Sequence, residues 1–248
     1  MDQAHDHPPL ELHRFRHSAF CEKVRLILCW KGLDHRLVEV TPGLGQLALF
    51  RLSGQRQVPV LVDGTSVVAD STAIALHLEQ RHPTPPLLPA EPRARARVLL
   101  LEDWSDTALA GAARLALLQA AAADPVLRTA LLPDPAPAPL RELLTALPAT
   151  VLVPVSSAVQ AVMAASEAQQ LQRNLEALGQ MVAAAPYLEG ECLSLADLAV
   201  AAQLGLLRFP ACAGEPLAGR GVDGIADNPL LEPLFRWRDA ILEEAGRG

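Results

Sequence analysis

One proline-rich stretch, residues 82–92 (HPTPPLLPAEP), constrains the fold more than any other feature of this sequence. It holds five prolines in eleven residues. Proline lacks the backbone N–H donor and fixes φ, so this density excludes a helix or a central strand. We therefore expect a semi-rigid linker over residues 83–92. The chain has 248 residues, enough for two modest domains on either side of it.

Before the linker, the sequence alternates between strand and helix patterns. Short alternating or compact apolar runs predict strands at 11–15, 35–40, 57–62 and 66–69, and longer runs predict helices at 19–31, 44–52 and 70–81. A strand–helix–strand unit followed by a hairpin and a closing helix is the thioredoxin-like arrangement. We expect an α/β thioredoxin-like N-terminal domain over residues 10–82, preceded by a disordered tail over 1–9.

After the linker, the pattern is helical throughout, which predicts an all-α C-terminal domain over residues 93–248. Helices are expected at 93–123, 141–184, 193–207 and 233–244, with a second proline-rich connector at 124–139. The stretch from Leu143 to Ser166 carries no charged side chain. Because Pro148 and Pro154 interrupt it, we interpret it as a buried or dimer-facing helix and expect no membrane span.

Charge and cysteine content exclude several classes of function. The formal net charge is −7, and no basic stripe is present to neutralise phosphates, so we expect no nucleic-acid partner. The four cysteines, at 21, 29, 192 and 212, form no CxxC pair, and no secretory leader is apparent. These features favour a cytoplasmic protein with reduced thiols. Two histidines near the start suit a mobile polar terminus, and we expect no metal site.

The first motif that carries chemistry is His17 to Arg25 (HSAFCEKVR), where the first strand passes into the first helix. A hydroxyl at a helix N-terminus can donate a hydrogen bond to a thiolate and favour the ionised form. Ser18 is placed for that role, although an ordinary helix N-cap would also be serine. The motif resembles the S-P-F-x-x-K/R-V-R signature of serine-type cytosolic glutathione transferases, with Ala19 in place of proline.

Two further motifs fall at the spacings of that family. Gln57 to Leu61 (QVPVL) resembles the strand in which thioredoxin-like proteins place a cis-proline, Pro59, so that the Val58 backbone can pair with a ligand. Asp70 to Ile74 (DSTAI) resembles the family's E-S-x-A-I motif. There Ser71 suits the γ-glutamyl carboxylate and Asp70 its ammonium group, although both could simply be caps.

The resemblance implies how these residues act together. Glutathione, the co-substrate, would be bound by Gln57, Val58, Pro59, Asp70 and Ser71, with Arg56 a further contact to its glycyl carboxylate. Ser18 would be the catalytic residue that stabilises the thiolate. The thiol would then attack a small apolar electrophile held by the helical domain. A detoxification role and a homodimer are also implied.

Two other interpretations stay open at this point. The chain could keep the fold as a non-catalytic binding protein, because Ala19 and the middle of the sequence depart from the family pattern. It could instead be a glutathione-dependent thiol reductase that works through Cys21. In the helical part, Ser194 and Asp197 lie within an L-x-G-x-x-x-S-x-A-D pattern and form a potential capping box, which serves folding rather than chemistry.

Overall fold

A computed structural model describes residues 9–41, 44–132 and 158–247 of the chain. The chain divides into two compact units, one of residues 1–88 with 243–248 and the other of residues 89–242. Among these described residues, the first unit contains a four-stranded sheet with three helices, and the regular elements of the second are helices. This confirms the predicted fold class, a thioredoxin-like N-terminal domain followed by an all-α domain. No helix among the described residues is long and apolar enough to cross a membrane.

The sheet of the first unit has the strand order β2-β1-β3-β4. Its strands are β1 Leu10–Arg14, β2 His35–Glu39, β3 Val60–Asp63 and β4 Ser66–Ala69. β1 pairs with β2 in parallel and with β3 in antiparallel orientation, and β3 and β4 form an antiparallel hairpin. The predicted third strand began at residue 57. The ladder starts only at Val60, because Pro59 has no backbone N–H to donate to it.

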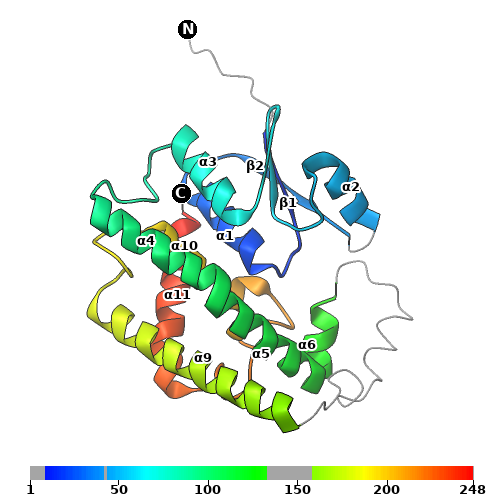
Figure 1. The fold of residues 1–248 in the computed structure, drawn as a ribbon, viewed down its shortest axis with the longest axis vertical. Coiled ribbons are helices and arrows are strands. Elements are labelled where there is room, and N and C mark those ends of the chain that lie inside the picture. Colours follow the sequence, from blue (N-terminus) through cyan, green and yellow to red (C-terminus); the bar gives the residue numbers. More distant parts are fainter. Residues whose placement is uncertain (1–8, 42–43, 133–157, 248) are drawn as a thin grey trace. The chain divides into compact units, whose positions relative to one another are not determined.

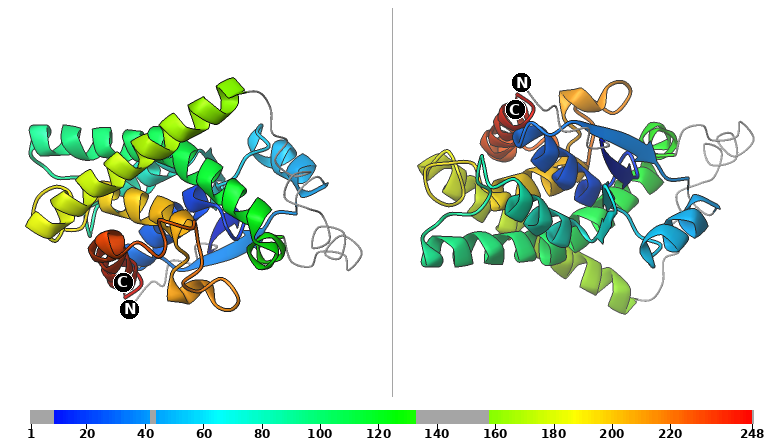
Figure 2. Two further views of the ribbon diagram at one scale, coloured as in Figure 1. Left: turned by 90° about the horizontal axis from the view of Figure 1, so that it is seen from below. Right: turned by 90° about the horizontal axis from the view of Figure 1, so that it is seen from above.

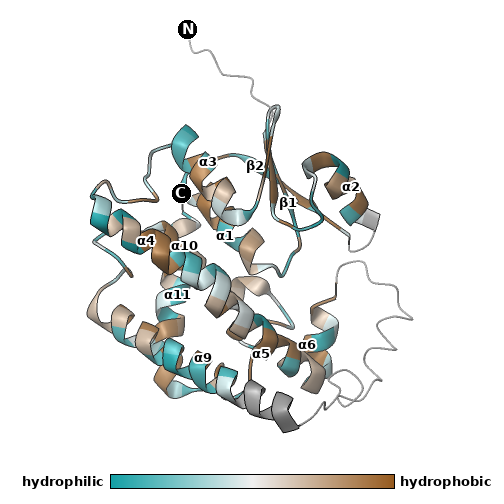
Figure 3. Ribbon diagram, viewed as in Figure 1, coloured by the Kyte–Doolittle hydropathy of each residue, from teal (hydrophilic) through white to brown (hydrophobic). Residues whose placement is uncertain are grey.

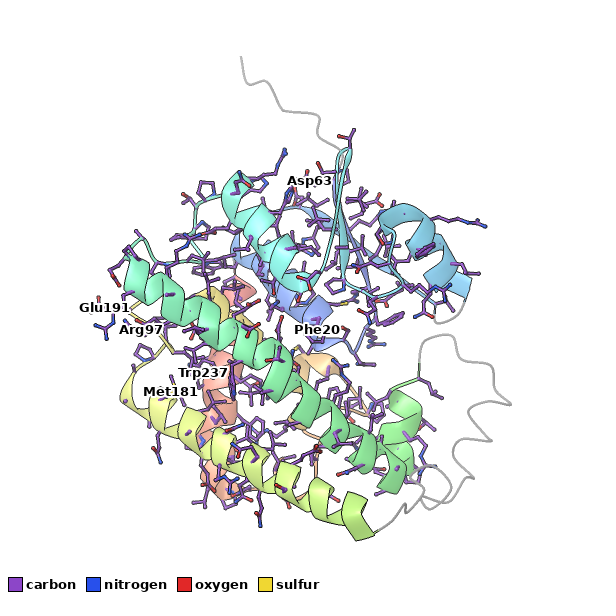
Figure 4. The ribbon with its side chains drawn as sticks, viewed as in Figure 1. Phe20, Asp63, Arg97, Met181, Glu191 and Trp237 are labelled. Carbon is purple, nitrogen blue, oxygen red and sulfur yellow. The ribbon has the colours of Figure 1, made fainter. Side chains whose placement is uncertain are left out.

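Three helices flank this sheet: α1 Ala19–Trp30, α2 Leu44–Ser53 and α3 Ser71–Arg81. Figure 1 shows α1 and α3 on one face of the sheet and α2 on the other. Asp63, at the end of β3, accepts a hydrogen bond from His77 (2.8 Å) and forms an ion pair with Arg81 (3.1 Å), both on α3. The side chain of Asp63 is labelled at the hairpin in Figure 4. These contacts hold the hairpin against α3.

A buried ion pair fastens the first part of the proline-rich segment to the first unit. Lys31 Nζ lies 2.7 Å from Glu79 Oε2 and donates to the carbonyl oxygens of His82 (2.5 Å) and Pro85 (2.8 Å). Glu79 in turn accepts hydrogen bonds from the backbone N–H groups of Leu87 and Leu88. All three ammonium protons of Lys31 therefore have acceptors, which offsets the cost of burying the charge.

The second unit contains α4 Pro92–Trp104, a π turn Ser105–Leu109, α5 Ala110–Ala123, α6 Pro125–Ala130, α9 Ala158–Ala184, α10 Leu195–Leu207 and most of α11 Glu232–Ala245. Figure 2 shows α9 crossing the continuous helix formed by α4, the π turn and α5. Arg97 of α4 pairs with Glu189, and its side chain is labelled in Figure 4.

The centre of the second unit is α10, which is buried on all sides except at Gly205. Figure 3 shows its apolar character beside the more hydrophilic α9. The capping box of Ser194 and Asp197 is confirmed: the Asp197 carboxylate accepts from Ser194 N–H and Oγ, and also from Leu188 N–H. Burial raises the pKa of Asp197, and those hydrogen bonds oppose the rise.

Two expectations about the helical region need comment. The predicted connector over 124–139 was wrong in its first part, where residues 125–130 form α6. Proline at the first helical position is tolerated there, because that N–H has no helical partner anyway, and Asp124 caps the helix by accepting from Val126 N–H at 2.8 Å. The interpretation of the uncharged stretch 143–166 stays a prediction, because its residues 143–157 lie outside the described residues.

Candidate functional site

Three predicted site segments leave the sheet of the first unit at the same edge. The register places His13 of β1 opposite Val60 of β3, and Val60 opposite Ala69 of β4. β1 therefore ends, β3 begins and β4 ends side by side (Figure 1). Ser18 follows β1, Val58 and Pro59 precede β3, and Asp70 follows β4. Two helix N-termini, those of α1 and α3, begin at this edge and present their partial positive charge there.

Side-chain packing supports the same grouping. A small core cluster of Val40, Leu49 and Val60 lies in the first unit, and Phe15, Val58 and Ala69 pack against it. These last three residues come from the ends of β1, β3 and β4. The structure therefore brings together the three chain segments that were expected to form one site.

Ser18 is the N-cap of α1. Its backbone is extended, with φ −90° and ψ 117°, and its Oγ accepts a hydrogen bond from Cys21 N–H at 3.4 Å. The bond is long, and the side chain is half-buried. The hydroxyl oxygen serves the cap as an acceptor, while its proton is a donor that the cap does not use. The cap therefore leaves the hydroxyl proton unused, and the Cys21 thiol is the group that hydrogen-bonds the Ser18 side chain within the protein.

The Val58–Pro59 peptide bond is cis. Since the ladder begins at Val60, strand pairing does not use the N–H or C=O of Val58. Those two groups can pair with a peptide-like ligand. Gln57 is exposed in the bend just before them, and the Arg56 guanidinium lies 5.7 Å from the ring centroid of Phe50 on α2.

Asp70 caps α3 with one oxygen. Its Oδ1 accepts from the N–H groups of Thr72 and Ala73, each at 3.0 Å, and its φ is +80°. A positive φ at a residue other than glycine costs about 1–3 kcal/mol and is frequent at ligand sites. The exposed carboxylate retains its second oxygen, Oδ2, outside these two bonds. Ser71, the first residue of α3, is buried.

Cys21 lies in the first turn of α1 and is only 1% exposed. Burial raises the pKa of its thiol to about 11, although hydrogen bonds with the Ser18 side chain and the Phe15 backbone act in the opposite direction. At neutral pH this thiol is almost entirely protonated. A nucleophilic role for Cys21 is therefore disfavoured, because the thiolate is the attacking species.

Lys23 is a residue near the site to which the sequence argument gave no role. It is 1% exposed, and its Nζ donates to Thr72 Oγ1 at 3.4 Å, which links the first turn of α1 to the first turn of α3. A lysine at the start of a helix signals nothing by itself. Its burial becomes apparent only once α1 and α3 pack together.

Within the described residues, no group of three or more His, Cys, Asp or Glu side chains could hold a metal ion.

Comparison with known proteins shows what the N-terminal unit is similar to. Residues 12–86 match the model of the glutathione S-transferase N-terminal domain. A zeta class glutathione S-transferase from Euphorbia esula is 36% identical over 92 residues, which are 36% of this chain and 41% of that protein. A stringent starvation protein A homolog from Pasteurella multocida is 34% identical over 90 residues, 34% of this chain and 42% of that protein.

A solved structure extends the likeness in fold to the helical unit. A glutathione S-transferase from Methylobacterium radiotolerans, crystallised in complex with glutathione sulfonate, aligns with a TM-score of 0.58 at 20% identity. The alignment covers 96% of this chain and 89% of that one.

The thioredoxin-like sheet, the cis-proline and the helical unit define a protein of the glutathione-transferase fold. Residues 12–86 match the glutathione S-transferase N-terminal domain, and the likeness of the rest of the chain is one of fold. The chain spans about two fifths of the length of the curated relatives that it matches.

Proposed function

We propose that this protein is a glutathione transferase that conjugates the glutathione thiol to a small apolar electrophile. The observation that carries the proposal is the common edge at which Ser18, the cis Val58–Pro59 bond and Asp70 meet. Each suits a different part of glutathione, and the chain contains the family's N-terminal domain.

In this proposal each group at this edge binds a different part of glutathione. The Val58 N–H and C=O pair with the cysteinyl backbone of glutathione, as an added strand does. Ser71 and the N-terminus of α3 bind the γ-glutamyl carboxylate, and Asp70 Oδ2 accepts from its ammonium group. Gln57, with Arg56 beside it, reaches the glycyl carboxylate.

Ser18 supplies the chemistry. Its hydroxyl donates a hydrogen bond to the sulfur, and the N-terminus of α1 adds a favourable field, so that the ionised thiol is stabilised. Lowering a thiol pKa by about two units corresponds to about 2.7 kcal/mol and raises the ratio of thiolate to thiol about a hundredfold. The thiolate then attacks the electrophile, and the leaving group departs with its electron pair.

The broader assignment follows from the same reaction. We propose that the enzyme works in the cytoplasm as a homodimer, in detoxification, with an acceptor site contributed by the helical unit.

A non-catalytic binding protein is the second candidate. What favours it is that the matched region, residues 12–86, is shared both with named transferases and with relatives named stringent starvation protein A homologs. Resemblance over this domain therefore does not by itself distinguish a catalyst from a binding protein. The thiol reductase that uses Cys21 is disfavoured by the burial of that thiol.

One pair of measurements separates the first two candidates. Glutathione is titrated into the purified protein by calorimetry, and conjugation to an aryl halide is then followed in the same preparation. A transferase binds glutathione and accelerates conjugation. A binding protein of this fold shows no acceleration, and absence of glutathione binding would overturn the transferase proposal.

A further inference from the structure

Among the described residues of the helical unit, Ser105 and Gln203 are almost fully buried, and each has a polar atom that the packing does not satisfy. Ser105 begins the π turn between α4 and α5 and is 0% exposed. Gln203 lies on α10 and is 1% exposed. Within residues 9–41, 44–132 and 158–247, neither Ser105 Oγ nor Gln203 Oε1 has a hydrogen-bond partner. Buried polar atoms of this kind are few in folded proteins, and each calls for an explanation.

Both side chains belong to elements that pack together. α10 contacts α4, the π turn and α5. α10 lies behind α4 in Figure 1, and Asp197 and Gln203 are its only polar residues. π turns are rare and occur frequently at functional sites, because the extra residue redirects side chains that an α-helix would align differently.

Asp197 provides an internal comparison on the same helix. It is equally buried, yet its carboxylate accepts from Leu188 N–H, Ser194 N–H and Ser194 Oγ. The buried carboxylate of Asp197, which caps the helix, is thus satisfied by hydrogen bonds within the chain. Gln203 Oε1 needs a donor, and the Ser105 hydroxyl can both donate and accept. A single hydroxyl group between them would meet both needs.

We propose that the junction of the π turn and α10 binds one hydroxyl group, which donates to Gln203 Oε1 and accepts from the Ser105 hydroxyl. Two sources carry this chemistry: an internal water molecule, or the hydroxyl of an alcohol or phenol on the acceptor substrate. The second source rests on the proposed transferase function, whereas the first does not. In the second case, Ser105 and Gln203 determine specificity for hydroxylated electrophiles.

The test uses the full chain and four variants: Ser105→Ala, Gln203→Met, the double variant, and Thr107→Val as a control. Thr107 lies in the same π turn, but it is exposed and its hydroxyl already bonds Asp103 O at 2.7 Å. Thermal midpoints are measured for all four. Initial rates are then measured with two aryl halides that differ only in carrying a hydroxyl or a methyl group.

A resident water predicts that each single variant lowers the midpoint by about 2–4 °C, as the loss of one hydrogen bond should in a chain of this size. The midpoint of the double variant should fall no further than that of the more destabilised single variant, because both residues bind the same water molecule. The control should change by less, and the relative KM of the two acceptors should stay the same.

A substrate hydroxyl predicts a different pattern. The midpoints stay level or rise, while KM for the hydroxylated acceptor increases about tenfold in the Ser105 and Gln203 variants and KM for its methyl counterpart does not. If the midpoints hold or rise and both KM values are unchanged, the pair binds nothing and the proposal is wrong. If the midpoint loss of the double variant equals the sum of the two single losses, the two residues do not bind one shared hydroxyl group and the proposal is also wrong. A protein that conjugates neither acceptor contradicts the transferase proposal, and the thermal data alone then decide this one.

Discussion

The two units use their polar side chains in different ways. In the thioredoxin-like unit, Ser18 and Asp70 stand at helix starts, each with a hydrogen-bonding group that the cap does not use. In the helical unit, Asp197 and Arg238 are buried and spend their hydrogen bonds on the chain itself. The groups that we propose to bind glutathione thus lie at helix starts and keep a donor or an acceptor for a ligand. The buried groups Asp197 and Arg238 bond to the chain itself, whereas Ser105 Oγ and Gln203 Oε1 find no partner among the described residues.

Replacing one aspartate cap in each unit should give the largest difference between the units, which is expected in glutathione affinity. Asp70→Ala removes both the cap of α3 and the proposed partner of the glutathione ammonium group, so glutathione binding should weaken by about 2–5 kcal/mol. Stability should fall by only about 1 kcal/mol. Asp124→Ala removes the matching cap of α6 and should cost similar stability without affecting binding. Calorimetric titration and denaturant midpoints on both variants make the comparison. If Asp70→Ala binds glutathione normally, Asp70 is only a cap.

A steric contact in the helical unit should give the next largest effect. A Cβ on Gly221 would lie 2.0 Å from Leu207 O and 2.8 Å from Arg208 Cα, and backbone atoms cannot easily yield. Gly221→Ala should therefore destabilise the protein by about 1–3 kcal/mol. Gly224, with φ +74° and open space around it, is the control, and Gly224→Ala should cost about 1 kcal/mol. Urea denaturation of both variants measures the difference. Equal midpoints would mean that the 207–221 contact is not rigid.

The cysteines should differ sharply in reactivity. With a pKa of about 11, roughly one Cys21 thiol in 3,000 is ionised at pH 7.5. Cys192 and Cys212 are exposed and should react with a disulfide reagent in the native protein, whereas Cys21 should react only after unfolding. Mass spectrometry of the labelled peptides identifies the sites. Rapid native labelling of Cys21 would revive the reductase interpretation.

The smallest expected effect is a dependence of stability on pH in the first unit. Burial lowers the pKa of His13 and of His82 below the ordinary value of 6.5. The unfolded chain then binds more protons than the folded chain, so stability should fall as the pH drops below about 6.5. Both side chains are only partly buried, so the change should stay under about 1 kcal/mol. His13→Gln should flatten the slope in thermal midpoints measured between pH 5 and 7.5. An unchanged slope in that variant would assign the acid sensitivity elsewhere.

The sequence predicted the first unit well because its signals are local. Alternating strands, the Asp63-Gly64 turn and the caps at Ser18 and Asp70 are each encoded within a few residues, and their order specifies the topology. The common edge of the three segments follows from strand register, which an antiparallel hairpin constrains. Strand β3 began later than predicted because proline at position 59 cannot donate to the ladder.

Other features depend on contacts between distant residues and could not be predicted in the same way. The Lys31–Glu79 pair joins residues 48 positions apart, and its purpose appears only when His82 and Pro85 return to it. Burial of Lys23 likewise depends on how α1 packs against α3. In the helical unit, neither the π turn nor the isolated Gln203 has a local signal that distinguishes it from ordinary helix. Packing, rather than pattern, decides these features.

The most direct test of the transferase proposal is the rate of glutathione conjugation by the Ser18→Ala variant. Loss of one oriented donor to a developing anion should lower kcat with an aryl halide by about 10²–10³, with glutathione affinity nearly unchanged. The apparent pKa of the bound thiol should rise toward that of free glutathione. Because Ser18 also caps α1, thermal midpoints are compared, and Ser18→Thr should restore both the cap and most of the rate. An unchanged rate and pH profile in Ser18→Ala would contradict the account.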